Sequence, residues 1–156
     1  MLLVDPPLSL YLSLSLSLSL THTHTHTHTH THTHTHTVIE VSFGSLSYSV
    51  REGDGEAVVT VFANSTDVSL TRPVSVRFTT MDNTASAGED YTSITSTLTF
   101  DSQRSEISVS IPITDDSLLE ELEDLSVYLS SDDLAVHLTS ASATVSISDN
   151  DSKSEL

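Results

Sequence analysis

The residues of this 156-residue chain that are best equipped for chemistry are carboxylates, which outnumber Lys and Arg by 22 to 5 and give a formal net charge of -17. Carboxylate oxygens are the ligands that hard cations prefer, and Ca²⁺ takes roughly six to eight of them. A run of acids is usually only a solvated face, so charge alone leaves both interpretations open. Most carboxylates of the chain after residue 50 stand in four stretches of the sequence, at residues 52–56, 82–90, 115–124 and 149–151.

Other functional classes find little support in the composition. So acidic a chain repels phosphate, which argues against nucleic acid as a partner. The absence of cysteine rules out disulfides and thiolate zinc sites and leaves the compartment open. The chain has no G-x-S-x-G elbow, and His137 is the only histidine outside the N-terminal repeats. We therefore expect no enzymatic activity and no catalytic residues.

An EF-hand is also rejected. The segment from Asp149 to Lys153 begins like an EF-hand calcium loop, but neither the glycine nor the bidentate glutamate follows where that motif requires it. A calcium site in this chain must therefore collect its carboxylates from several stretches.

The first 37 residues are low in complexity. Residues 8–20 alternate almost strictly Leu-Ser, and residues 21–37 alternate Thr-His. Closely spaced imidazoles can share Zn²⁺, Cu²⁺ or Ni²⁺, so one interpretation is a transition-metal buffer. We favour another, in which adjacent CT and AC dinucleotide repeats are translated without selection on the protein. Residues 1–37 are therefore expected to be a disordered tail or a gene-model artefact, and residues 38–156 to be the folded domain.

The Leu-rich segment is a poor targeting signal. It lacks a basic region and carries Asp5 and a Pro6-Pro7 pair, unlike a signal peptide. It is also too short and too polar for a transmembrane helix. We expect no direct membrane insertion by this chain.

The elements that must position the acids are β-strands. After residue 37, short alternating apolar runs are separated by polar turns, which predicts an all-β domain. We expect seven strands, near residues 41–50 (broken near Gly44), 57–63, 74–80, 96–100, 107–113, 125–129 and 143–147. Such one-faced strands need a partner sheet, which predicts a seven-stranded immunoglobulin-like antiparallel β-sandwich. Pro112 marks an edge or a strand end, and residues 117–124 could add a helical turn.

Strand polarity then brings the acids together. If successive strands alternate in direction, the strands near residues 41–50, 74–80, 107–113 and 143–147 all end at one pole of the sandwich. The segments that follow these four strands contain fourteen acids, namely Glu52, Asp54, Glu56, Asp82, Glu89, Asp90, Asp115, Asp116, Glu120, Glu121, Glu123, Asp124, Asp149 and Asp151. Like charges forced together cost stability unless they protonate or bind a cation. Mg²⁺ keeps more of its water and suits such a cage less well, so this arrangement predicts Ca²⁺.

Four blocks of sequence, in order between residues 43 and 151, carry a family resemblance. They are Tyr48-Ser49-Val50-Arg51-Glu52; Ala85-Ser86-Ala87-Gly88-Glu89-Asp90-Tyr91 with Leu98-Thr99-Phe100; Ile113-Thr114-Asp115-Asp116 with Glu120-Glu121-Leu122-Glu123; and Val145-Ser146-Ile147-Ser148-Asp149-Asn150-Asp151. Together they resemble the Calx-beta domain. The resemblance implies a Ca²⁺-binding sandwich like those in sodium/calcium exchanger regulatory loops and in large extracellular or adhesion proteins.

The resemblance also implies that the family's calcium ligands fall on eight residues of this chain, which are Glu52, Asp90, Asp115, Asp116, Glu120, Glu123, Asp149 and Asp151. Two positions depart from the family pattern. Asn150 occupies a position where the exchanger-type pattern has a third aspartate, and Ser117 occupies one where another acid is common. Fewer ions or weaker affinity are therefore expected. The implied context is a larger membrane-associated, cell-communication or adhesion protein with neighbouring Calx-beta or other domains, either extracellular or cytoplasmic. The alternative is a non-catalytic spacer module that binds Ca²⁺ weakly or not at all.

Overall fold

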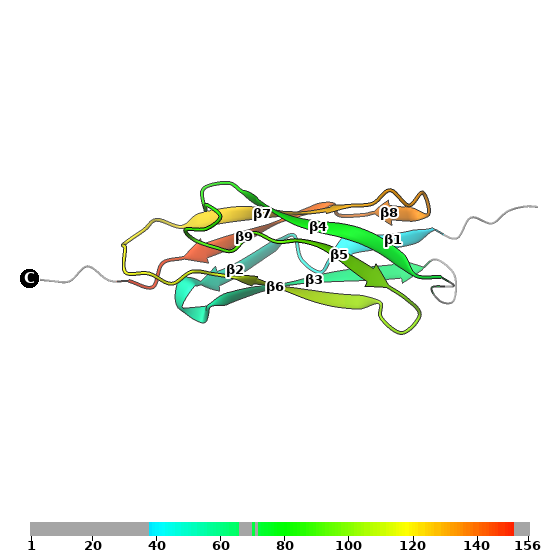
Figure 1. Cartoon of the computed structure of the whole chain (residues 1–156), viewed down its shortest axis with the longest axis horizontal. Helices are drawn as coiled ribbons and strands as arrows, with labels where there is room; N and C mark the ends of the chain where they lie inside the picture. Colours follow the sequence, from blue (N-terminus) through cyan, green and yellow to red (C-terminus); the bar gives the residue numbers. More distant parts are fainter. Residues whose placement is uncertain (1–37, 66–69, 71, 152–156) are drawn as a thin grey trace, which may run out of the picture. The chain divides into compact units, whose positions relative to one another are not determined.

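Alternating apolar side chains fold the chain into two β-sheets packed face to face (Figure 1). The computed structural model describes residues 38–65, 70 and 72–151. The strands within these residues are β1 (Ile39–Phe43), β2 (Ser47–Arg51), β3 (Glu56–Ser65), β4 (Val74–Asp82), β5 (Thr95–Phe100), β6 (Glu106–Pro112), β7 (Glu123–Ser130), β8 (Val136–Leu138) and β9 (Ser142–Ser148). One 3₁₀ turn, η1 (Glu52–Asp54), follows β2. The predicted N-terminal tail lies outside the described residues.

The two sheets enclose a single apolar core. One sheet has the strand order β6-β3-β1-β8 and the other β2-β9-β7-β4-β5. On β3, Ala57, Val59 and Val61 point inward at every second position, as a half-buried strand requires. Phe43 and Phe78, from opposite sheets, meet edge to face with ring centroids 6.3 Å apart. The predicted all-β sandwich is confirmed.

The strand count and the pairing differ from the expectation. The single strand expected near residues 41–50 is two strands, because the chain crosses from one sheet to the other at residues 44–46. Gly44 permits the crossing: a Cβ there would lie 2.8 Å from a ring carbon of Phe62. After the crossing β2 pairs parallel with β9, and the additional short strand β8 pairs parallel with β1. The described residues therefore form nine strands, and the sandwich is not wholly antiparallel.

The helical turn expected within residues 117–124 is absent, since residues 118–122 form a loop and β7 begins at Glu123. Aspartate side chains accept hydrogen bonds from backbone N–H groups of this loop. The N–H of Leu118 donates to Asp116 Oδ1 (2.7 Å), and that of Glu120 donates to Asp149 Oδ2 (2.9 Å). The first of these contacts joins residues two apart, and such local bonds from a side chain to the backbone compete with helix formation. Pro112 ends the edge strand β6, as expected.

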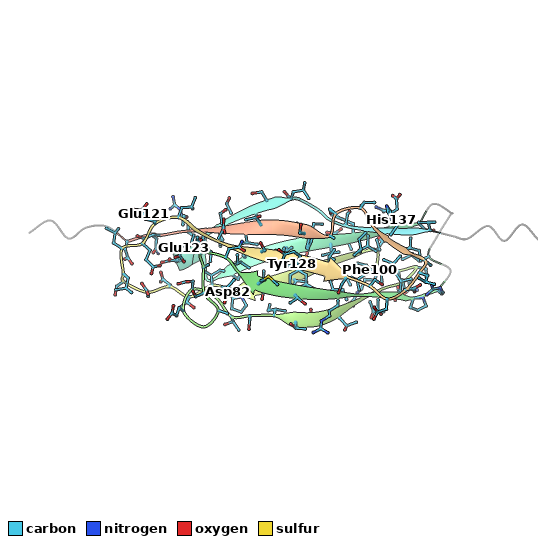
Figure 2. The ribbon with its side chains drawn as sticks, turned by 90° about the horizontal axis from the view of Figure 1, so that it is seen from above. Asp82, Phe100, Glu121, Glu123, Tyr128 and His137 are labelled. Atoms are coloured by element: carbon cyan, nitrogen blue, oxygen red, sulfur yellow. The ribbon has the colours of Figure 1, made fainter. Side chains whose placement is uncertain are left out.

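The direction of the strands decides where the loops meet. β2, β4, β6 and β9 deliver their C-terminal ends to the left end of the sandwich in Figure 1, which we call the acidic pole. Its loops are residues 52–55, 83–94, 113–122 and 149–151. Figure 2 shows Asp82, Glu121 and Glu123 toward this end, and His137 at the other. No helix of the described residues is long and apolar enough to cross a membrane.

Candidate metal centre

Glu52 is a buried carboxylate at the start of the turn that follows β2. Its side chain is 4% exposed. The turn is held by Asp54, which accepts the Arg51 N–H (3.1 Å), and by Gly55, whose φ of 76° ends it with an N–H bond to the Glu52 carbonyl (3.0 Å). Only glycine adopts such a φ without strain. Within the described residues, Glu52 Oε2 has no hydrogen-bond partner, an unusual state for a buried charge.

Asp90 is presented by a tight turn after β4. Its Oδ2 accepts the Ser86 N–H (2.6 Å), and its own N–H donates to the Ser86 carbonyl (3.0 Å). Gly88, at φ 94°, makes this turn possible. The Asp90 carbonyl accepts the Thr114 N–H (2.8 Å), so this loop is fastened to the loop after β6.

Asp149 organises the loop that carries Glu120. Its Oδ2 accepts the Glu120 N–H (2.9 Å) and its Oδ1 accepts the Asp151 N–H (2.6 Å). These backbone donors lower the pKa of Asp149, so its carboxylate remains charged while it joins the two loops.

Six of the eight predicted residues form two groups of three. Glu52, Asp116 and Asp151 make up the first triad, and Asp90, Glu120 and Glu123 the second. In each triad, one carboxylate oxygen per residue lies within 4.8 Å of the others. Every member was predicted from strand polarity to lie at this pole, so the convergence of the loops is confirmed.

Asp115 and Asp149 belong to the same pole but to neither triad. Asp115 Oδ1 accepts a hydrogen bond from Asn150 Nδ2 (3.1 Å), and Asp149 is engaged by backbone as described. The structure therefore gathers all eight candidates but divides them into six that face one another and two that hold loops together.

The crowding has an electrostatic consequence. Burial raises the pKa of Glu52 to about 7, and the charges of Glu120 and Asp149 add to the effect. The pKa values of Glu120, Glu123 and Asp151 are also raised, in each case first by desolvation and then by neighbouring carboxylates. With no cation present, the folded state therefore resists the full ionisation of this pole.

The chemistry of the donors fits a hard divalent cation. Both triads consist of carboxylates only, the donor set that Ca²⁺ selects. Asp151 Oδ2, like Glu52 Oε2, is buried without a hydrogen-bond partner in the described part of the chain, and both oxygens belong to the first triad. The ion pair between Arg72 and Asp133 (2.7 Å) joins the chain before β4 to the turn after β7, so it does not neutralise the triads.

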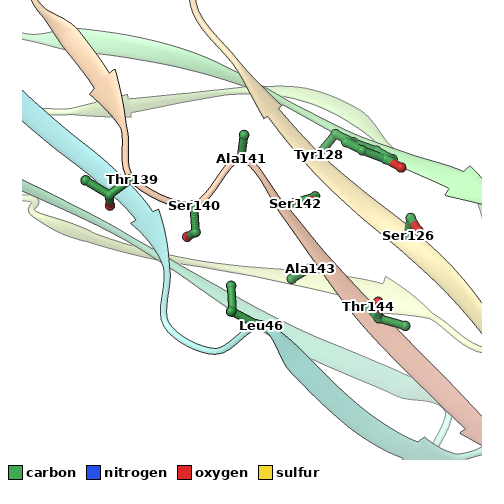
Figure 3. Close-up of a pocket in the computed structure, with 9 residues that line it drawn as sticks. All are labelled: Leu46, Ser126, Tyr128, Thr139, Ser140, Ala141, Ser142, Ala143 and Thr144. Carbon is green, nitrogen blue, oxygen red and sulfur yellow. The ribbon is translucent and has the colours of Figure 1, made fainter.

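A hollow elsewhere in the surface offers no comparable chemistry. It measures about 450 Å³ and lies over β7, β9 and the turns before β2 and β9. Figure 3 shows its lining, which is Leu46, Ser126, Tyr128, Thr139, Ser140, Ala141, Ser142, Ala143 and Thr144. These side chains are hydroxyls and small apolar groups, without a carboxylate or an imidazole. The acidic pole is the stronger candidate site.

Sequence reasoning missed two supporting contacts. Tyr91 is buried, and its hydroxyl binds Asp82 beside the site. Gly53 lies so close to Asn150 that a Cβ would come within 2.5 Å of its Nδ2. The Gly-Asp-Gly sequence at residues 53–55 was the available signal for a crowded turn.

Comparison with known proteins identifies relatives. A family model described as the Calx-beta domain matches residues 34–151. Sodium/calcium exchanger 1 of Canis lupus familiaris is 33% identical over 93 residues, which is 60% of this chain and 9% of the exchanger. The Rattus norvegicus protein of the same name is 34% identical over the same length. The chain therefore spans only 9% of the length of these curated relatives.

Solved structures show the same likeness. The crystal structure of the apo-form Calx CBD1 domain aligns with a TM-score of 0.68 at 34% identity, covering 73% of this chain and 99% of that domain. The CBD12 structure from CALX1.2 aligns at 0.65 and 34% identity, covering 72% of this chain and 46% of that one. The Calx CBD2 domain, at 19% identity and a TM-score of 0.60 (71% of this chain, 86% of that one), shares the fold.

Proposed function

The chain belongs to the Calx-beta family, and from this we propose that it is a calcium-binding module whose acidic pole holds Ca²⁺ between the loops that follow β2, β4, β6 and β9. One observation carries the proposal: Glu52 is 4% exposed and has a carboxylate oxygen without a hydrogen-bond partner among the described residues, facing two other carboxylates. A charge buried in this way is expected to be paired or to coordinate a metal.

Each triad has a separate role in this proposal. Glu52, Asp116 and Asp151 would hold one ion, and Asp90, Glu120 and Glu123 a second. Asp115 and Asp149 would fasten the loops and complete the acidic pole. The bound ion supplies the positive charge that offsets the crowded carboxylates.

The expected physical result is a pole that becomes rigid when calcium is present. The carboxylates of four separate loops repel one another when metal-free, and a shared cation reverses the sign of that interaction. Because a ligand that binds only the folded state stabilises it by mass action, the free energy of unfolding should rise by about 2.7 kcal/mol at a hundred times the dissociation constant.

The parent protein is part of the proposal as well. The resemblance to exchangers, of which this chain spans 9%, supports a module within a larger membrane-associated, cell-communication or adhesion protein. Its partners would be neighbouring Calx-beta or other domains. We propose no catalytic role, and we propose that residues 38–156 form the domain while residues 1–37 lie outside it.

Calorimetric titration of the full chain with Ca²⁺ tests the proposal. Binding in the micromolar range, with much weaker binding of Mg²⁺, is the result expected for a calcium sensor. Millimolar binding, or none, would instead support the alternative of a spacer module. Replacing one carboxylate in each triad should remove the binding.

A further inference from the structure

The side-chain amide of Asn150 lies where three loops of the acidic pole meet. Its Nδ2 donates to Asp115 Oδ1 across 3.1 Å. Gly53 is close to the same amide. A Cβ added to Gly53 would lie 2.5 Å from Asn150 Nδ2 and 3.9 Å from Asp115 Oδ1. The absence of a side chain at residue 53 leaves room for this amide. Turn η1, the loop after β6 and the chain after β9 therefore meet at one NH₂ group, which is hydrogen-bonded to the loop after β6 and packs closely against η1.

In this contact the amide NH₂ of Asn150 lies beside Asp115 in the way that a bound cation would. Asp115 is acceptor-only when ionised, so the donating NH₂ of Asn150 must face it. The amide hydrogens carry partial positive charge and occupy a lone pair of the carboxylate that a metal would otherwise use. An aspartate at the same position would have nearly the same shape, but it would present a second negative oxygen to Asp115.

The difference between the two side chains bears on ion number. Asp115 is outside both triads, although its charge reaches Asp151, whose pKa it helps to raise. A carboxylate at position 150 would complete a third group of acids with Asp115 and Asp151. The amide prevents this while it keeps the three loops together in the absence of metal.

We propose that Asn150 sets the calcium stoichiometry of this domain: its amide takes the place of a cation beside Asp115, so the pole holds two ions, one per triad, and not a third. This inference rests on the proposed function and deepens it. It concerns how many ions the carboxylates admit, which that function leaves open.

Native mass spectrometry and calorimetry of the full chain in Ca²⁺ test the inference. We expect two ions on the wild-type chain and three on Asn150→Asp. Without calcium the variant should melt at a lower temperature, because the carboxylate repels Asp115, and its calcium-induced rise in melting temperature should exceed that of the wild type. Far-UV circular dichroism establishes that the variant is folded.

Asn83→Asp is the matched control. The Asn83 amide also donates to a carboxylate, Asp124 Oδ1, across 3.1 Å, but it does so beside β7, where its second hydrogen bond (2.8 Å) goes to the hydroxyl of Ser126. This variant adds the same charge and should still bind two ions.

The outcomes separate the inference from the proposed function. A wild-type chain that binds no Ca²⁺ would end both. A wild-type chain with three or more ions, two ions on Asn150→Asp, or a third ion on Asn83→Asp as well would overturn the role of Asn150 while calcium binding stands. If Asn150→Asp does not fold, wild-type stoichiometry alone still decides, because any number other than two contradicts the inference.

Discussion

Tyr91 donates its phenolic hydroxyl to Asp82 Oδ1 across 2.5 Å, which ties the last residue of β4 to the loop that presents Asp90. The same oxygen of Asp82 accepts the Ala87 N–H (3.0 Å). The ring is 1% exposed, and burial, followed by the bond to Asp82, raises the pKa of Tyr91 to about 12. The hydroxyl therefore stays protonated and continues to donate at any ordinary pH.

Tyr91→Phe should destabilise the domain and loosen the second triad. Removing the hydroxyl deletes its hydrogen bond to Asp82, an exposed carboxylate that water can then solvate, so the cost is about 0.5–1.5 kcal/mol. Because Asp90 precedes Tyr91, the calcium-induced rise in melting temperature should also shrink. Both quantities can be read from thermal melts in EDTA and in Ca²⁺.

Tyr48→Phe is the control for that experiment. The Tyr48 hydroxyl donates to the Thr60 carbonyl (3.2 Å) on a segment that carries no candidate ligand. This variant should lower the melting temperature but leave the calcium-induced rise intact. Equal loss of the rise in both variants would show that Tyr91 acts through general stability and does not position Asp90.

One substitution in each triad should abolish the response to calcium. Asp116→Asn with Glu123→Gln preserves side-chain shape and removes one charge from each group of three. In the absence of metal this variant should be more stable than the wild type, since two repelling charges are gone. In Ca²⁺ its melting temperature should not rise.

The control removes the same charge at a distance from the site. Glu106→Gln with Asp132→Asn changes exposed acids at the start of β6 and after β7, away from the acidic pole. A normal calcium response is expected. If the triad variant responds to calcium as the wild type does, the assignment of ligands is wrong.

The sequence predicted where the acids would meet but not how they would be arranged. Period-two alternation, clearest between Ile107 and Ile113, determined the strands, and strand direction then determined the pole. Which carboxylates face one another depends on side-chain and loop contacts, such as Asp149 accepting the Glu120 N–H, that no periodicity encodes. The break near Gly44 was predicted, but the change from one sheet to the other was not, because apolar side chains alternate on both sides of the break.

The burial of Glu52 was also beyond prediction from the sequence. A glutamate after a strand is normally exposed, and only the turn held by Asp54 and Gly55 directs this one inward. The same turn creates the unpartnered oxygen on which the site assignment rests.

Stability without metal should depend on pH through Glu52. Its pKa is about 7 in the folded state and near 4.5 in the unfolded chain, so the folded state binds more protons between these values. The free energy of unfolding should therefore be highest near pH 4.5 and should fall as the pH rises through 7. Glu120, Glu123 and Asp151, whose pKa values are also raised, act in the same direction. Melts in EDTA between pH 5 and 8 measure the slope.

Glu52→Gln should flatten that slope, because the amide does not titrate. Saturating Ca²⁺ should also flatten it for the wild type, since the cation holds the carboxylate ionised. A wild-type melting temperature that rises from pH 5 to pH 8 in EDTA would contradict the raised pKa of Glu52.

Deleting residues 1–37 should leave the domain and its calcium response unchanged. The buried core of the described residues begins at Ile39, which is 3% exposed, so the cut removes none of it. The Thr-His repeat carries eight of the nine histidines, so the deletion should abolish tight binding of Zn²⁺, which prefers imidazole. Melting in EDTA and Ca²⁺, with calorimetric titrations of both chains with Ca²⁺ and Zn²⁺, separates the two metals. A truncated chain that melts several degrees lower would place the domain boundary before residue 38, and one that loses calcium binding would assign part of the site to the repeats.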